Sequence, residues 1–331
     1  MKPLRVGIIG AGLMGRWHGH TAMRLGAQVV AIADREQSAA AELGKRLGCS
    51  QLYGSGEDLI NGEQLDALHI CTPLDSHVEL ARTGLQAGTN VLVEKPLAPD
   101  AAATRSLCDT ARELQVLLCP VLQFPFQSGV QRAQADMNAA GAIRHLEMTV
   151  CSAGGIGRGD EGLKSLVAEV LPHPLSIVQA LLPGGLDEAE WIPRSPKPGE
   201  LLLQGQVRDI SVNVTLSLAS RPTENSLRLR GEDGTWMIDL FHGYGYFLPG
   251  GVSRSRKIRM PFEQACRSVF HATKNLTLRS LHREPAYPGL RSLIREFHGA
   301  IRNEGDSPID LECVLKIAQA QETILNTSTH P

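Results

Sequence analysis

A glycine-rich turn near the N-terminus constrains the fold of this chain more than any other feature. An apolar run at residues 4–9 leads into residues 10–15, which read G-x-G-x-x-G, and apolar side chains then recur at helical spacing. A strand, a glycine turn and a helix in this order present backbone N–H groups at a helix N-terminus, where a pyrophosphate meets no Cβ atoms. The alternative is a glycine-rich turn of some other α/β protein. We predict a dinucleotide site formed by Gly10, Gly12, Leu13, Met14 and Gly15.

The residue that ends the next apolar run indicates which dinucleotide binds. Residues 27–33 lead to Asp34, whose carboxylate can accept hydrogen bonds from the adenosine ribose hydroxyls and would repel a 2′-phosphate. This favours NAD. Arg35 keeps NADP open, because its guanidinium could pair with that phosphate, although a solvated arginine is the simpler interpretation. We therefore expect NAD as the cofactor, with NADP as the alternative.

The order of apolar runs and helical patterns predicts the fold class. Short apolar runs alternate with helical patterns up to about residue 120, which indicates βαβ units and a parallel sheet. Residues 143–151 and 210–218 instead alternate apolar and polar side chains, as in an antiparallel sheet with one packed face. Asp233-Gly234 predicts a hairpin turn with positive φ. We predict an α/β chain with a Rossmann domain at 1–121 and an α+β domain at 122–331. The sheet of the second domain should be open and largely antiparallel, and its final helix can pack back on the first domain.

The composition and charge argue against several other classes of protein. There are 33 Lys and Arg against 35 Asp and Glu, a net charge of -2, so the chain lacks the basic excess of a nucleic-acid binder. None of the 7 cysteines forms a C-x-x-C motif, so neither a zinc site nor a disulfide framework is indicated. The N-terminal apolar run is too short for a signal peptide, and no run of about 18 apolar residues follows. We expect a cytoplasmic protein with no membrane span, no nucleic-acid partner and no metal site.

Two later turns carry residues that suit chemistry on an alcohol. Glu94-Lys95-Pro96 follows a strand, and a lysine at that edge of a parallel sheet can stabilise a developing alkoxide. A surface lysine at a turn is the alternative. Thr72-Pro73 ends the preceding strand, and His77 follows it. His77 either lies beside a ligand or is a histidine at a helix start with no functional role. Ser76 and Glu79 have the spacing of a capping box.

These motifs together resemble the glucose–fructose oxidoreductase / inositol dehydrogenase (Gfo/Idh/MocA) family over nearly the whole chain. The match is specific in the glycine turn, Asp34 and the two later turns, and looser in the hairpin at residues 226–235. It implies a Rossmann domain and a substrate-binding domain whose open sheet mediates oligomer contacts, so we expect a homodimer or homotetramer. It also implies a cis peptide bond before Pro96 and a nicotinamide site beside the two turns. The cofactor-side residues there would be Thr72, Pro73, His77, Glu94, Lys95 and Pro96.

The second catalytic element of the family is an Asp-x-x-x-His pair on a helix. His173 occupies the histidine position here, and Glu169 stands where the family usually has Asp. Ser176 replaces a further acid, and the prolines at 172 and 174 indicate that the helix begins or breaks at this histidine. The family's arginine near residues 124–125 is absent, so the substrate preference cannot be transferred. For His173, the alternative is a helix-start histidine bonded to backbone.

The resemblance implies an NAD(P)-dependent oxidoreductase acting on a secondary alcohol of a sugar, cyclitol or sugar derivative. Lys95 would polarise the reacting oxygen, His173 would take up the hydroxyl proton and Glu169 would support one of them. One alternative is a redox-assisted glycosidase or epimerase without net cofactor turnover. The other is a non-catalytic NAD-sensing regulator, against which the presence of both Lys95 and His173 argues.

A basic stretch lies in the C-terminal half. Residues 254–302 contain eleven Lys or Arg against three Glu. A solvated helical face is the simplest interpretation. A rim that attracts an anionic substrate, such as a nucleotide-linked or phosphorylated sugar, is the sharper one, and contact with a lipid surface is a weaker third.

Overall fold

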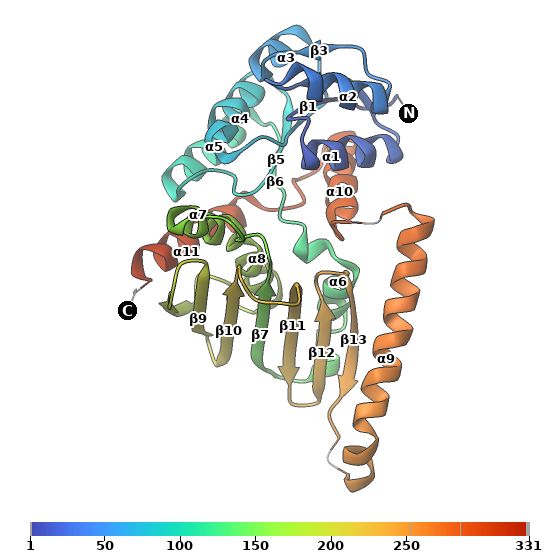
Figure 1. Ribbon diagram of the computed structural model, residues 1–331, viewed down its shortest axis with the longest axis vertical. Helices are drawn as coiled ribbons and strands as arrows, with labels where there is room; N and C mark the ends of the chain where they lie inside the picture. The colour runs from blue at the N-terminus through green and yellow to red at the C-terminus, as the bar shows by residue number, and fades with distance from the viewer. Residues whose placement is uncertain (1, 252, 285, 329–331) are drawn as a thin grey trace. The chain divides into compact units, whose positions relative to one another are not determined.

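The computed structural model describes residues 2–251, 253–284 and 286–328. The chain forms two compact units. The first comprises Met1–Val121 and Arg291–Gln319, and the second comprises Leu122–Leu290 and Ala320–Pro331. Both units contain a sheet with helices packed on it (Figure 1).

A six-stranded parallel sheet forms the centre of the first unit. Its strand order is β3-β2-β1-β4-β5-β6, so the chain reverses direction across the sheet after β3. Every residue of β4 is buried, as expected of a parallel strand covered on both faces. The strands are β1 (Arg5–Ile9), β2 (Gln28–Ala33), β3 (Leu52–Tyr53), β4 (Ala67–Ile70), β5 (Asn90–Val93) and β6 (Leu118–Pro120).

Helices connect these strands, and local signals explain several of their ends. The Asp100 carboxylate accepts a hydrogen bond from the Ala103 N–H (2.7 Å) and so caps α5, and α2 ends at Gly48 with φ 68°. Figure 1 shows α10 beside α1. The helices are α1 (Leu13–Arg24), α2 (Gln37–Leu47), α3 (Gly56–Gly62), η1 (Leu74–Ser76), α4 (His77–Gln86), α5 (Ala101–Leu114), α10 (Leu290–Asn303) and α11 (Leu311–Thr327).

A seven-stranded sheet dominates the second unit, in the order β13-β12-β11-β7-β10-β9-β8. Only β7 and β10 pair in parallel; the other neighbours are antiparallel. The predicted fold class, a Rossmann domain followed by an α+β domain with a largely antiparallel open sheet, is confirmed. The strands are β7 (Ile143–Cys151), β8 (Ala189–Arg194), β9 (Glu200–Val207), β10 (Ile210–Ser217), β11 (Glu224–Gly231), β12 (Gly234–Asp239) and β13 (Tyr244–Pro249).

The hairpin between β11 and β12 forms where it was predicted, but its turn is held differently. Neither Asp233 nor Gly234 has φ in the left-handed range, so the predicted positive φ is wrong. Instead, the backbone N–H groups of Glu232 and Asp233 donate to the carbonyl oxygens of Ala142 (3.1 Å) and Ala140 (2.8 Å). Contact with the preceding segment therefore replaces the local turn chemistry.

The helices of the second unit include one unusually long, exposed element. Helix α9 runs along β13 (Figure 1) and contains no buried residue. Pro261 lies inside this helix, seven residues after its first residue. Its exposed apolar side chains include Ile258, Phe262, Val269, Phe270 and Leu276. No helix in the described residues is long and apolar enough to cross a membrane. The helices are η2 (Phe124–Phe126), α6 (Ser128–Ala135), η3 (Met137–Ala140), α7 (Asp160–Val170), α8 (Pro172–Leu181) and α9 (Arg254–Leu281).

Candidate functional site

The glycine turn has the geometry that a pyrophosphate requires. Gly10 has φ +97°, and a Cβ at Gly15 would lie 1.8 Å from the Gly10 carbonyl oxygen, so both positions need glycine for the fold itself. A Cβ at Gly12 would meet nothing within 4 Å. Gly12 is the N-cap of α1, and no side chain of the described residues caps that end, so the N–H groups of Leu13 and Met14 stand at an open helix N-terminus. The predicted turn is thus open at the one position where a ligand would approach.

Asp34 holds the glycine turn to the end of β2. Its Oδ2 accepts from the Ala11 N–H (2.7 Å) and its Oδ1 from the Glu36 N–H (2.8 Å). A carboxylate has about four acceptor sites, so both oxygens can still accept ribose hydroxyls. Arg35 is exposed. The open helix end and the fixed carboxylate fit NAD, with the glycine turn for the pyrophosphate and Asp34 for the ribose.

His77 joins the two later turns. The residue is 1% exposed, with ring atom Nδ1 2.8 Å from the Pro96 carbonyl oxygen and Nε2 2.8 Å from the Thr72 carbonyl oxygen. The Lys95–Pro96 peptide bond is cis, as the resemblance implies. Ser76 does not form the predicted capping box, because the preceding η1 turn gives it helical backbone angles (φ -103°, ψ -5°) and its oxygen accepts no capping hydrogen bond. Its hydroxyl lies 2.8 Å from Thr72 Oγ1 and 3.0 Å from the Pro73 carbonyl oxygen, to which it can donate. His77 therefore fixes the two predicted cofactor-side turns against each other.

Lys95 is half-buried, and the adjacent Glu94 is buried. The Lys95 backbone N–H donates to Glu94 Oε2 (3.3 Å), and Glu94 Oε1 lies 3.1 Å from His18 Nε2. Glu94 stays a predicted cofactor-side residue, and its carboxylate contacts a histidine of α1.

His18 begins a row of buried histidines that the sequence analysis missed. His18 Nδ1 lies 3.2 Å from His69 Nδ1, and His69 Nε2 lies 3.2 Å from His298 Nε2. None of the three residues has exposed surface. We call Glu94, His18, His69 and His298 the histidine chain. A histidine in the apolar strand β4 was a signal that could have prompted a search for buried partners, because an imidazole in a core needs hydrogen bonds.

In the second unit, a helix break separates the two predicted catalytic residues. Helix α7 ends at Val170 and α8 begins at Pro172, so half-buried Glu169 lies in the last turn of one helix and His173 in the first turn of the next. The His173 ring is stacked on Phe124, with centroids 4.3 Å apart and planes 10° apart. The His173 carbonyl accepts from the Ser176 hydroxyl (2.7 Å). Stacking on Phe124 thus restrains the orientation of the imidazole.

Two buried glutamines lie where the family has its arginine. Gln127 Nε2 donates to the Leu240 carbonyl oxygen (2.9 Å). The side-chain oxygens of Gln123 and Gln127 are buried and have no hydrogen-bond partner among the described residues. Both flank the η2 turn that carries Phe124, the residue stacked on His173.

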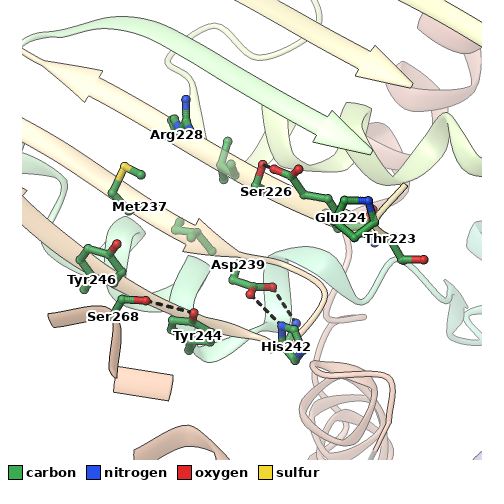
Figure 2. Close-up of a pocket in the computed structure, with 14 residues that line it drawn as sticks. Thr223, Glu224, Ser226, Arg228, Met237, Asp239, His242, Tyr244, Tyr246 and Ser268 are labelled. Atoms are coloured by element: carbon green, nitrogen blue, oxygen red, sulfur yellow. Dashed lines mark hydrogen bonds and ion pairs between the residues drawn. The ribbon is translucent and has the colours of Figure 1, made fainter. Parts of the chain in front are cut away.

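A separate pocket of about 340 Å³ lies on the second sheet (Figure 2). Strands β11, β12 and β13 and helix α9 line it, and Figure 2 shows the Asp239–His242 pair and the Tyr244–Ser268 contact at its wall. It includes no residue that the sequence analysis predicted as catalytic or cofactor-binding. No group of three or more His, Cys, Asp or Glu within the described ranges is arranged to hold a metal ion.

Residues 4–121 match the family model GFO_IDH_MocA, described as an oxidoreductase family with an NAD-binding Rossmann fold. The chain is 30% identical over 155 residues to a UDP-N-acetylglucosamine 3-dehydrogenase of Acidithiobacillus ferrooxidans, covering 44% of this chain and 45% of that protein. It is 33% identical over 119 residues to a D-glucoside 3-dehydrogenase of Escherichia coli, covering 35% and 34%. The matches therefore span less than half the length of these relatives.

Solved structures share the fold over the whole chain. The UDP-N-acetylglucosamine 3-dehydrogenase GnnA of Acidithiobacillus ferrooxidans superimposes with a TM-score of 0.75 and 19% identity, covering 99% of this chain and 98% of that one. A levoglucosan dehydrogenase in complex with NADH gives a TM-score of 0.76 and 16% identity, covering 99% and 97%. At these identities the comparison establishes the fold.

Proposed function

Because its N-terminal domain belongs to the Gfo/Idh/MocA oxidoreductase family and has that family's NAD-binding Rossmann fold, we propose that this chain is an NAD(P)-dependent dehydrogenase. Its substrate would be a secondary alcohol of a sugar, cyclitol or sugar derivative. The observation that carries the proposal is the glycine turn, open at Gly12 alone, together with the Lys95 turn that His77 ties to the Thr72 turn. The substrate class is supported by the names of relatives, which act on UDP-N-acetylglucosamine, glucosides and inositol.

The predicted cofactor residues would bind different parts of NAD. The α1 N-terminus supplies N–H donors and a favourable dipole to the pyrophosphate. Asp34 accepts from the adenosine ribose and disfavours a 2′-phosphate. The Thr72 and Pro96 turns would border the nicotinamide ribose. When bound, the nicotinamide supplies the acceptor for the hydride.

Lys95 supplies the positive charge at the reacting oxygen. A lysine ammonium donates a hydrogen bond to the substrate hydroxyl and stabilises the negative charge that grows there as the C–H bond weakens. Half-buried surroundings strengthen that effect relative to water. The hydrogen bond between its backbone and Glu94, and the His77 contact at Pro96, restrain the turn that carries it.

His173 takes up the hydroxyl proton. Stacking on Phe124 holds the ring in one orientation, as a general base requires. Glu169, one turn earlier on α7, is proposed to orient the histidine or contact the substrate.

The experiment is a panel of sugars, cyclitols and nucleotide sugars, with NADH formation followed by fluorescence. The proposal expects NADH to accumulate with at least one secondary alcohol. Product formation without NADH accumulation would favour a redox-assisted glycosidase or epimerase instead. Binding of NADH with no turnover of any compound would favour an NAD-sensing regulator.

A further inference from the structure

Helix α9 packs on the second unit through polar side chains. Ser268 Oγ lies 3.4 Å from Tyr244 Oη on β13. Asn275 Nδ2 and Arg279 Nη1 both donate to the His242 carbonyl oxygen, at 2.9 Å and 2.7 Å. Positions 268, 275 and 279 lie on one side of the helix, which is the side that faces the sheet. The apolar side chains of α9 are therefore left for another surface.

A regular apolar stripe runs along α9, about a quarter of a turn around the helix from the side that faces the sheet. Its positions are spaced alternately by four and three residues, as in the seam of a coiled coil. It is about 27 Å long at the rise of an α-helix. Its four large side chains are 66–73% exposed, and a contiguous stripe of this size on a soluble protein marks a contact surface. We call it the α9 stripe; it consists of Ile258, Phe262, Ala265, Val269, Ala272 and Leu276.

The order of large and small side chains makes the α9 stripe complementary to itself when two copies run antiparallel. Around a two-fold axis at the middle of the stripe, the first position meets the last one of the second copy. In the inner layers, Phe262 meets Ala272 of the second copy, and Val269 meets its Ala265. Each bulky inner side chain thus faces an alanine, as close packing requires. A parallel pair would instead set phenylalanine against phenylalanine and alanine against alanine.

The charges of α9 also permit this contact. Arg256, Arg267 and Lys274 lie on the opposite side of the helix, roughly 160° from the α9 stripe. Of the positions directly beside the stripe, only Arg259 is charged, and the antiparallel pair places it opposite Thr273 of the second copy. Two copies therefore meet without opposing like charges. A helix lying on a lipid surface would need its cations beside the apolar side, where they reach the headgroups, rather than opposite it.

We propose that the α9 stripe binds the α9 stripe of a second copy of this chain, antiparallel and around a two-fold axis. Such a contact uses the same patch on both copies, so it closes on itself and joins two of them. It is separate from the open sheet to which the resemblance assigns oligomer contacts. It involves neither the glycine turn nor the Lys95 turn, so its test does not depend on the proposed function.

Two neighbouring positions of α9 provide a matched pair of variants. Val269 belongs to the α9 stripe, whereas Phe270 is similarly exposed but lies outside it. Val269→Glu places a charge in an inner layer of the pair, so it should halve the mass of the particle in analytical ultracentrifugation. Phe270→Glu introduces the same charge on the same helix and should leave the mass unchanged. Circular dichroism and Tm show that both variants remain folded.

Cys266 tests the direction of the pair. It lies beside the α9 stripe near its middle and is the one exposed cysteine among the described residues. In the antiparallel pair the two Cys266 side chains lie on the same flank, close to the two-fold axis, whereas a parallel pair puts them on opposite flanks. A short bismaleimide should therefore join two wild-type copies, and Val269→Glu and Cys266→Ser should each abolish that product.

Three results would overturn the proposal. The first is equal mass for the wild type and folded Val269→Glu protein. The second is a halved mass in that variant when the wild type gives no cross-link through Cys266, which would exclude the antiparallel arrangement. The third is wild-type binding to vesicles of phosphatidylserine and phosphatidylcholine that Val269→Glu abolishes without a change in mass, which would assign the α9 stripe to a lipid surface.

Discussion

Replacing Gly12 by valine should weaken cofactor binding severely and leave the fold intact. Gly12 has φ -68° and ψ -159°, an extended conformation that valine adopts, and a Cβ there meets nothing within 4 Å. We therefore expect a stability change within about 1 kcal/mol, the cost of a poorer N-cap. A branched side chain in the approach to the pyrophosphate forces the ligand away from the helix end, as overpacking does, at about 3 kcal/mol or roughly 100-fold in Kd.

Two other glycines provide the controls. Gly299→Val places the same side chain in open space on α10, so it should leave both NADH affinity and Tm nearly unchanged. Gly15→Ala should lower Tm sharply, because its Cβ would lie 1.8 Å from the Gly10 carbonyl oxygen. The assays are NADH fluorescence titration and thermal unfolding. Wild-type NADH affinity in folded Gly12→Val protein would refute the assignment of the turn to the pyrophosphate.

Three further predictions follow from individual side chains. Asp34→Ser should shift preference from NAD toward NADP in paired Kd measurements, because it removes the charge that repels a 2′-phosphate and leaves Arg35 to pair with that phosphate; an unaltered ratio would contradict this. Lys95→Met should lower kcat while NADH affinity persists, and His173→Gln should lower kcat by about 10²–10⁴-fold. If both act on one oxygen, the double variant should be little worse than the poorer single one, whereas multiplied effects would show independent roles. The pKa of His298 is about 4 in the folded protein and 6.5 in the unfolded chain, so between these pH values the unfolded chain binds one more proton. The free energy of unfolding should therefore fall by about 3 kcal/mol as the pH drops from 6.5 to 4. In denaturant titrations, His298→Gln should reduce this pH dependence.

Local patterns predicted the elements that depend on local physics. The apolar run, glycine turn and helix start at residues 4–24 follow from backbone constraints within one βα unit, and the alternation at 210–218 follows from one packed sheet face. Asp34 could be predicted as the end of a strand. The hydrogen bond that Asp34 accepts from the Ala11 N–H could not be predicted, because that contact depends on how β2 lies beside β1.

The remaining features depend on contacts between distant segments. His69 and His298 are 229 residues apart, and no periodicity or spacing links them. Ser76 had the capping-box spacing, yet it ends a 3₁₀ turn in a helical conformation and its side chain caps nothing. Phe124 precedes His173 by 49 positions, so their stacking follows from the packing of η2 on α8. Such tertiary contacts override local sequence signals, and the sequence around either residue does not predict them.

The central claim is that this chain oxidises a secondary alcohol with NAD through Lys95. The most direct measurement compares the wild type with Lys95→Met for NADH formation across sugars, cyclitols and nucleotide sugars, after both proteins are shown to bind NADH equally. We predict that at least one compound yields NADH with the wild type and far more slowly with the variant. Equal rates in the two proteins, or no NADH from any compound despite wild-type NADH binding, would contradict the claim.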